Sequence, residues 1–571
     1  VYIFNSNISL ILKMSLSAEP VKTYIVDDPR ICFDRKASYL IERSGGDVTY
    51  RKWKANSAST SSISFNTLIP SRDTVVANKI YVRIPISVTI TGNNADPVGG
   101  AAVPVDQFLG LRFAPFTQCC NSIQLELNGK VQSTNIYRYL NGLMKFCNTR
   151  DEMTNDFSCM PTYMDTYSSY YDPEASAGPA GTLQPIPYQT VMNPLKTYDD
   201  TCSYEPSGRV GYLRNITKTR AAVGNTSVTL TFEIEEIIPL SPLMWGHRDA
   251  KGLIGLDTLN INFQIRDLSR MFSSPRYGLN RAGGGPPVNL GLTFAFNQET
   301  LMGAELEFIY IKPRANVPIP RTIKYPYNNV KDFSTKGAQD SPCRLNYSIP
   351  VPDHQYSEQF NNIQLQGVPK RLYIFARRED SQQNYYTTDT FARITSITLD
   401  LGTRSGLLSE ATPQALYRIS VKNGYRGTWD QWYNQTGSVL CLDFGSDVSL
   451  DLLDAPGALK QMQISFTLKY SNIYVADPNP AGAGPHAASD VNFTIYCIVV
   501  YDGMMIIKDG EVLFESNDVS ALDVADSKQA VRLCYDDLAD YVYGGTFVGG
   551  SLSKFISKAK VGLTKAKDFR S

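Results

Sequence analysis

Hydrophobic and polar residues alternate with a period of two along most of this chain, which is the pattern of half-buried β-strands. The clearest run is Lys79–Ile90 (KIYVRIPISVTI), in which every second residue is aliphatic. Helical patterns are few and short, with a clear one only at the C-terminus. The chain is therefore predicted to be all-β. The other predicted strands are Ser61–Leu68, Ile123–Leu127, Ser227–Ile237, Leu259–Ile265, Leu290–Phe296, Ala304–Ile311, Asn346–Val351, Arg371–Phe375, Ile394–Leu401, Met462–Tyr470 and Asn492–Val500.

Four strand patterns of the first half of the chain recur, in the same order, in the second half. NSIQLELNG and TSITLDLGT, for example, both place Ile, Leu and Leu two residues apart and end on a turn residue. The extra residues of the first half fall in segments that already have the composition of loops. An ordered set of this kind indicates two tandem copies of one sandwich. The matched pairs are residues 79–82 and 371–374, 121–129 and 395–403, 259–265 and 462–468, and 304–311 and 492–500.

Two stretches break the alternation and suggest how the chain is divided. At about 145–225, Tyr, Ser, Pro, Gly and Asp mix without a period, which indicates a long surface loop. Around Lys312–Lys324 (KPRANVPIPRTIK), prolines and basic residues interrupt every pattern, as in a linker. Met14 is a candidate start of translation, in which case residues 1–13 would be upstream translated sequence. The predicted parts are an extension at 1–20, a first sandwich at 21–315 with the insertion at about 145–225, a second sandwich at 316–525 and a tail at 526–571.

Size and composition narrow the class of protein. A chain of 571 residues is too long for one ordinary core, so two or more domains are expected. Lys+Arg and Asp+Glu both number 55, so the net charge favours neither nucleic acid nor membrane as a partner of the whole chain. No apolar run reaches the 18 or so residues that a membrane-spanning helix needs.

Cysteine and histidine offer no metal site. The ten Cys contain no C-x-x-C pair, and the three His lie far apart, which favours reduced, buried thiols and predicts neither a metal nor a cofactor. His247, His354 and His486 accompany no G-x-S-x-G or H-E-x-x-H motif, so we interpret them as structural or surface residues. RAGGGPP at 281–287 lacks the Lys and Ser/Thr of a phosphate-binding loop and is interpreted as a turn.

One acidic cluster invites a catalytic interpretation. Glu233, Glu235 and Glu236 (FEIEEI) could supply the paired carboxyl groups that glycoside hydrolysis requires. However, Glu233 and Glu235 alternate with apolar residues, so they more simply form the solvent face of a strand. We predict no catalytic residue and no enzyme.

The C-terminal residues 551–571 (SLSKFISKAKVGLTKAKDFRS) have a distinct character. Apolar residues recur at helical spacing and leave one apolar stripe among lysines, after the flexible sequence YGGTFVGG. We predict a basic amphipathic helix, which either is solvated or contacts an anionic membrane, a partner protein or packaged nucleic acid. The candidate contact residues are Lys554, Lys558, Lys560, Lys565, Lys567 and Arg570.

The ends of the two halves resemble the double jelly-roll major capsid proteins, a family that includes adenovirus hexon and the capsid proteins of virophages, polinton-like viruses and nucleocytoplasmic large DNA viruses. AELEFIYIKPRANVPIP followed by TIKYPYNNV is similar to the last strand of a first jelly roll and its crossover. VPKRLYIFARRED and NFTIYCIVVYDGMMIIKDGEVLF are similar to an early and the final strand of the second. The resemblance covers about residues 20–525.

This resemblance implies a structural protein without catalytic site or cofactor. Its fold would be two tandem eight-stranded jelly-roll β-sandwiches with long loop insertions and a short C-terminal helix. Three chains would form a pseudo-hexagonal capsomer that tiles an icosahedral shell, with the insertion at about 145–225 as an outward tower. The implied partners are other copies of the chain, neighbouring capsomers, penton and minor capsid proteins, and packaged DNA or an inner membrane through the tail. The protein would be assembled inside the host cell and located in the virion.

Two other functions stay open at this point. A viral spike or a receptor- or carbohydrate-binding protein could also be built from two sandwiches, although it gives no reason for the basic tail. A carbohydrate-active enzyme would need a carboxylate such as Glu233 or Glu235 for its activity.

Overall fold

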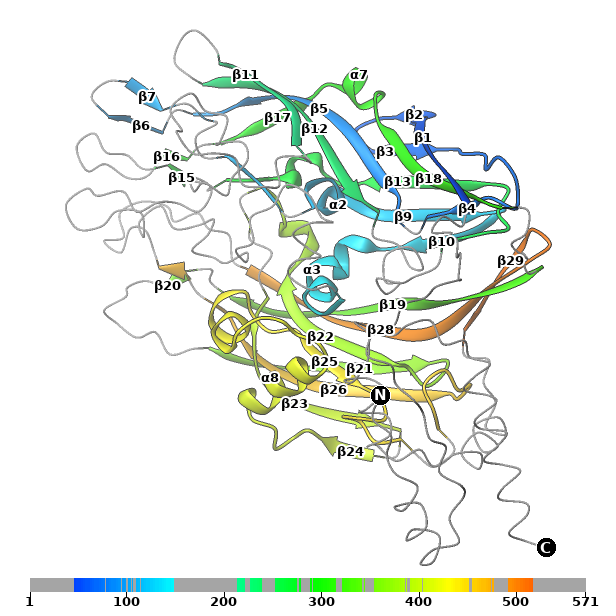
Figure 1. Cartoon of the computed structure of the whole chain (residues 1–571). Helices are drawn as coiled ribbons and strands as arrows, with labels where there is room; N and C mark the ends of the chain where they lie inside the picture. The colour runs from blue at the N-terminus through cyan, green and yellow to red at the C-terminus, as the bar shows by residue number, and fades with distance from the viewer. Residues whose placement is uncertain are drawn as a thin grey trace, which may run out of the picture. The chain divides into compact units, whose positions relative to one another are not determined.

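The structure is a computed structural model that describes residues 46–147 and 213–516, apart from internal gaps. The longest gaps are 239–251, 279–287, 345–353 and 477–490. Contacts divide the chain into residues 1–47, of which only Gly46 and Asp47 are described, and residues 48–571. Nearly all described strands and helices belong to the second unit (Figure 1).

Most strands before residue 314 form two antiparallel sheets that make up the first sandwich (Figure 1). Sheet I has the order β1 (Gly46–Lys54), β18 (Glu305–Pro313), β5 (Tyr81–Thr91), β12 (Ser227–Ile237) and β11 (Leu213–Arg220), with β17 (Thr293–Phe296) on β5 and β4 (Val75–Val76) on β18. Sheet II has the order β10 (Lys130–Thr134), β9 (Cys120–Leu127), β13 (Leu259–Ile265), β3 (Ser62–Phe65) and β2 (Ser57–Ala58).

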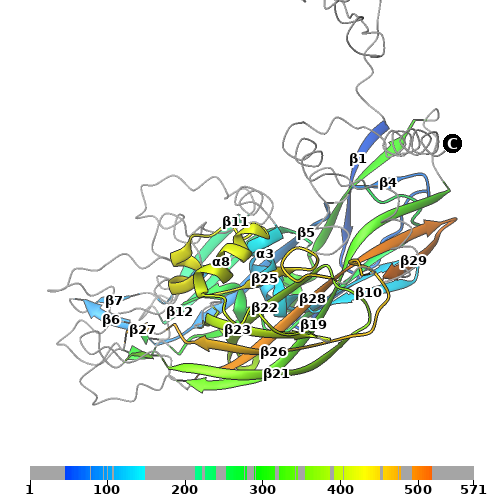
Figure 2. The ribbon, with the colours of Figure 1, turned by 90° about the horizontal axis from the view of Figure 1, so that it is seen from below.

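Strands after residue 321 form the second sandwich. Figure 2 shows its sheet II with β21 and β26 next to each other at one edge. Sheet I has the order β19 (Thr322–Asp340), β28 (Val491–Lys508), β22 (Arg371–Arg378) and β25 (Leu440–Asp443), with β29 (Glu511–Ser516) on β28. Sheet II has the order β21 (Gln355–Leu365), β26 (Met462–Ser471), β23 (Arg393–Leu401) and β24 (Arg404–Leu407).

Four helices, three short helical turns and four two-stranded pairs complete the described secondary structure. The helices are α2 (Pro115–Cys119), α3 (Ile136–Cys147), α7 (Gln298–Leu301) and α8 (Pro413–Lys422), with single helical turns at Leu268–Met271, Asp380–Gln382 and Gln431–Gln435. The two-stranded pairs are β8 (Gly110–Leu111) with β14 (Phe272–Ser273), β15 (Tyr277–Gly278) with β16 (Val288–Asn289), β6 (Ala95–Val98) with β7 (Ala101–Val103), and β20 (Cys343–Arg344) with β27 (Val475–Ala476).

The alternation of apolar and polar residues in the sequence explains why the sheets pack as a sandwich. In β5, Val82, Ile84, Ile86, Val88 and Ile90 point into the core and are at most 2% exposed. Their neighbours in the sequence face outward, because successive side chains of a strand lie on opposite faces of its sheet. Each such buried aliphatic side chain contributes about 1.5–3 kcal/mol to folding. The two inward faces thus form the core of each sandwich.

The predicted repeat is confirmed strand by strand. β5 and β22, which carry the matched sequences KIYV and RLYI, both pair with the closing strand of their half, β18 or β28. β9 and β23 both pair with the next matched strand, β13 or β26. The neighbours also correspond, since β1, β12, β10 and β3 occupy the places of β19, β25, β24 and β21. The two sandwiches therefore share one topology.

The register of the repeat differs between the halves by two residues. In the first sandwich Ile261 pairs with Leu125, whereas its counterpart Ile464 pairs with Leu401. Leu125 corresponds in the sequence to Leu399, two residues before Leu401. A shift of two residues keeps every apolar side chain on the inner face, so both registers bury the same pattern.

Several expectations need correction. The sequence pattern indicated a clear helix only at the C-terminus, and it missed α3 and α8, which have 12 and 10 residues. The linker predicted at Lys312–Lys324 is strand at both ends, since β18 continues to Pro313 and β19 begins at Thr322. The predicted strand at 346–351, most of the insertion at about 145–225, the extension at 1–20 and the whole tail at 526–571 lie outside the described residues.

Candidate functional site at the junction of the two sandwiches

Helix α3 lies between the sandwiches. Its apolar residues Ile136, Leu140, Leu143 and Phe146 follow helical spacing and are all buried. The helix lies against β9 of the first sandwich on one side and against β22 of the second on the other. The helix therefore packs against both sandwiches.

The contact of α3 with the second sandwich is close and aromatic. A Cβ at Gly142 would lie 3.2 Å from the ring of Phe375, so glycine allows the helix backbone to approach the sheet. The ring of Phe146 packs edge-on against Tyr373, with 5.2 Å between centroids. The Nζ atom of Lys145 lies 4.5 Å from the centre of the Phe391 ring, where a cation is attracted to the ring face.

Two buried arginines hold a loop of the second sandwich. Arg112 is 1% exposed and Arg270 is 4% exposed. Arg112 donates hydrogen bonds to the carbonyl oxygens of Phe272, Asn384, Tyr385 and Thr387. Arg270 donates to the same Asn384 carbonyl at 2.7 Å. Because a guanidinium presents five donors in a planar fork, it can satisfy several buried carbonyl groups of one loop.

Another contact of the junction joins two hairpin turns. Asn128 (φ 46°) and Gly129 (φ 82°) form the β9–β10 turn, and Asp509 (φ 51°) and Gly510 (φ 89°) form the β28–β29 turn. The side-chain amide of Asn128 donates to the Gly510 carbonyl at 2.7 Å. Arg72 donates to the Asp509 carbonyl at 2.8 Å. The two turns are thereby tied together.

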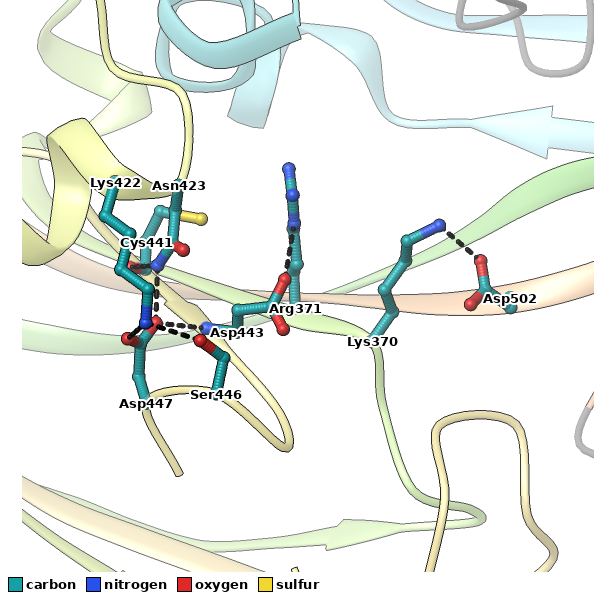
Figure 3. A network of polar contacts seen from close by, with 9 residues as sticks. All are labelled: Lys370, Arg371, Lys422, Asn423, Cys441, Asp443, Ser446, Asp447 and Asp502. Carbon is teal, nitrogen blue, oxygen red and sulfur yellow. Dashed lines mark hydrogen bonds and ion pairs between the residues drawn. The ribbon is translucent and has the colours of Figure 1, made fainter. Parts of the chain in front are cut away.

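A polar network anchors α8 to the second sandwich (Figure 3). The Asp447 side chain is 5% exposed. Its carboxylate accepts hydrogen bonds from Asn423 Nδ2 at 2.6 Å and from the Asp443 backbone N–H at 3.0 Å, and pairs with Lys422 Nζ at 2.9 Å. Asn423 Nδ2 also donates to the Cys441 carbonyl at 2.8 Å. These contacts fix the C-terminal end of the helix to β25.

One acidic residue of the cluster FEIEEI is fully buried. Glu236 accepts hydrogen bonds from the backbone N–H groups of Phe116 and Thr117, at 2.7 and 3.0 Å, and from the Thr117 hydroxyl at 2.7 Å. Burial raises the pKa of its carboxyl to about 7, and these hydrogen bonds oppose the rise. Glu236 is two and four residues from the buried Ile234 and Phe232, so its side chain lies on the same, inward face of the strand. This spacing was the sequence signal that Glu236 is buried.

Comparison with known proteins decides the family. The family model of the Sputnik virophage major capsid protein 1st domain matches residues 20–301, and that of the major capsid protein V20 C-terminal domain matches residues 348–503. The chain belongs to the virophage-type major capsid proteins. This capsid protein is 24% identical to capsid protein V20 of Sputnik virophage over 587 residues, which is 97% of the chain and 89% of its relative.

Two solved structures share the fold of this capsid protein. A chain of the Sputnik virophage, solved at 3.5 Å by cryo-EM, has a TM-score of 0.69 and 22% identity, and covers 93% of this chain and 100% of its own. The crystal structure of the mavirus major capsid protein has a TM-score of 0.65 and 15% identity, and covers 91% and 100%. The predicted all-β double jelly roll is confirmed. Because the relatives are structural proteins of virions, the predicted location and the prediction that the chain is not an enzyme are confirmed as well.

The other residues singled out in the sequence of this capsid protein do not form a site. Glu235 pairs with Arg83 at 2.7 Å on the outer face of sheet I, as expected for a solvent face. His354 is a surface residue, with its side chain 59% exposed and Nδ1 3.7 Å from Asp340. Among the described residues no cluster could hold a metal ion, and no helix is long and apolar enough to cross a membrane.

Three of the sequence predictions fall on residues beyond this description. They concern the two other histidines, the RAGGGPP turn at 281–287 and the basic tail residues. The basic residues are Lys554, Lys558, Lys560, Lys565, Lys567 and Arg570, and the histidines are His247 and His486.

The residues of the junction itself were missed at the sequence level. Arg112 stands in GLRFAP, where nothing in the local pattern distinguishes a buried arginine from a solvated one. For α3, the spacing of Ile136, Leu140, Leu143 and Phe146 was a usable signal of an amphipathic helix.

Proposed function

We propose that this capsid protein assembles as a homotrimeric, pseudo-hexagonal capsomer and that these capsomers tile an icosahedral shell. The observation that carries the proposal is the strand-for-strand correspondence of the two sandwiches in one chain. Three chains then place six similar units around one axis. The buried junction supports this arrangement, because a ring of six units needs a fixed angle between the two sandwiches of each chain.

The domain limits belong to the same proposal. We assign the first jelly roll to residues 21–315 and the second to residues 316–525, with an extension at 1–20 and a tail at 526–571. The insertion at about 145–225 forms the outward tower of the capsomer. The partners are further copies of the chain, neighbouring capsomers, and penton and minor capsid proteins.

Light scattering on the purified full chain tests the trimer. We expect a mass near three times 63.5 kDa, independent of concentration in the micromolar range. An obligate capsomer of this kind buries a large interface, so dilution should not release monomers readily. A stable monomer without any higher assembly would count against the proposal and would favour a soluble spike or lectin.

We further propose that the basic tail contacts the packaged genome, an inner membrane or a minor capsid protein. Its cations are Lys554, Lys558, Lys560, Lys565, Lys567 and Arg570. Polyanion binding through such residues is electrostatic and therefore weakens with salt.

Deletion of residues 551–571 tests this role of the tail. We expect shells to form and to lose their content or inner layer, visible by electron microscopy and by nucleic-acid content. Shells of unchanged content would show that the tail is a solvated helix. Replacing the six tail cations with Gln in the full chain is the matched control for length, and should reproduce the loss if charge is the cause.

A further inference from the structure

The correspondence of the two sandwiches extends to their long helices. In the first sandwich α3 follows the β9–β10 hairpin and lies against β9. In the second, α8 follows the β23–β24 hairpin and lies against β23. Since β9 corresponds to β23 and β10 to β24, α3 and α8 occupy equivalent places.

The two helices differ in what covers their far sides. The far side of α3 is packed on sheet I of the second sandwich, through Gly142 and Phe146. The far side of α8 is exposed and carries Arg418, Val421 and Lys422. Val421 is 41% exposed. Aligning the buried Leu140 with the buried Leu416 places Arg418 at the position of Gly142 and Lys422 at that of Phe146.

The surface that α3 covers also has a counterpart. α3 covers the outer face of β22, where Tyr373 and Phe375 point. The corresponding strand is β5, and the matched sequences place Tyr81 and Arg83 at these two positions. Tyr81 and Arg83 alternate with the buried Val82 and so face outward from sheet I of the first sandwich.

This outer face of sheet I carries three carboxylates near its centre and exposed apolar residues at its edge. Glu235, Glu305 and Glu307 surround Arg83, with the nearest carboxylate oxygen at 2.7 Å, and Lys52 lies 3.8 Å from Glu305. On the same side of β1 as Lys52, Val48 is 53% exposed and Tyr50 is 68% exposed. The face therefore carries charges of both signs, since Lys54 lies on the same side of β1 as Lys52, and its carboxylates on β12 and β18 are acceptors for the exposed Arg418 of α8.

We propose that α8 of one chain docks on the outer face of sheet I of the first sandwich in a second copy of the chain. The contact repeats between chains the packing that α3 makes within a chain, and it rests on the trimer proposed above. Arg418 meets the carboxylates of β12 and β18, and Val421 meets apolar surface. The interface is head-to-tail, and its repetition in each of three copies is the contact that closes the ring of the proposed trimer. The Asp447 network holds α8 rigid for this contact (Figure 3).

The double variant Arg418→Glu with Val421→Asp tests the contact in the full-length protein. We expect the concentration at which trimers dissociate to rise at least tenfold, measured by light scattering on dilution. Both residues are exposed, so circular dichroism and the melting temperature of the dissociated chain should stay at the wild-type values. The matched control is Lys336→Glu with Leu459→Asp, which makes the same kinds of change at exposed positions on other elements.

A charge exchange makes the test specific to the proposed surface. Glu307→Arg alone should weaken the trimer, and combining Glu307→Arg with Arg418→Glu should restore part of the lost affinity, since opposite charges then face each other again. If the wild type is a trimer and the double variant Arg418→Glu with Val421→Asp forms equally stable trimers, the proposed α8 interface is wrong. The proposed trimer would be unaffected by that result. A wild-type protein that is monomeric would overturn both proposals. Equal weakening by the control variant would also contradict a contact through α8.

Discussion

Replacing Arg112 with Met is expected to lower the free energy of unfolding by about 3–5 kcal/mol. The guanidinium donates to four carbonyl groups, three of which belong to residues 384–387 of the second sandwich. Each buried acceptor that loses its donor costs about 1–3 kcal/mol, and methionine fills the space without donating. Denaturant unfolding followed by Trp fluorescence measures the change.

Two further substitutions separate this role from a general effect of arginine. Arg426→Met removes an exposed guanidinium and should change stability by less than about 0.5 kcal/mol. Arg112→Lys keeps the charge but not the planar fork, so an intermediate loss is expected. If Arg112→Met is as stable as the wild type, the loop does not depend on this residue.

The second large effect concerns pH. Below pH 4.5 the Glu236 carboxyl binds a proton in both the folded and the unfolded chain. Between pH 4.5 and about 7 the folded chain keeps this proton and the unfolded chain releases it, because burial raises the pKa of the folded state to about 7. The free energy of unfolding therefore falls as the pH rises through this window, by about 3 kcal/mol in total. Above pH 7 this contribution is constant.

The variant Glu236→Gln isolates this contribution, because an amide does not titrate. We expect the stability of the wild type relative to this variant to decrease from pH 4.5 to pH 8, followed by the melting temperature in a pH series. Glu233→Gln makes the same change on the outer face of the same strand and is the control for the loss of a carboxyl group from β12. Parallel curves for the wild type and Glu236→Gln would show that Glu236 does not bind a proton in this range.

The repeat could be recognised in the sequence, whereas its register could not. Ile123, Leu125 and Leu127 match Ile397, Leu399 and Leu401 in letters and spacing, and both sets are buried. Yet the pairing with the neighbouring strand differs by two residues between the halves. Hydrophobic alternation has a period of two, so it cannot distinguish registers that differ by two. The register depends instead on the backbone hydrogen bonds of the folded sheet and on the bulge between Ile394 and Ser396, and the sequence pattern shows neither of them.

The junction was harder to predict than the sandwiches, because its residues depend on contacts between segments far apart in the chain. β19 begins TIKYPYNNV, where Pro326 and polar residues conceal a strand of 19 residues. Only Tyr325, Tyr327 and Asp340 of this strand are buried, so its apolar signal is weak. β19 is the first strand in the order of its sheet, and proline is tolerated on such edge strands. Sequence alone therefore favoured a linker there.

The meeting of the two hairpin turns has a consequence for synthesis of the protein in the cell. The Gly510 carbonyl, which receives the Asn128 amide, lies 382 residues later in the chain. At a synthesis rate of about 5–20 residues per second, Gly510 is added to the chain roughly 20–80 s after Asn128. Until then β22 and β19 also lack β28, the strand that lies between them. A nascent chain that ends before β28 exposes unpaired strand edges, which are sites of aggregation. Folding of the second sandwich is thus expected to finish only after β28 has left the ribosome.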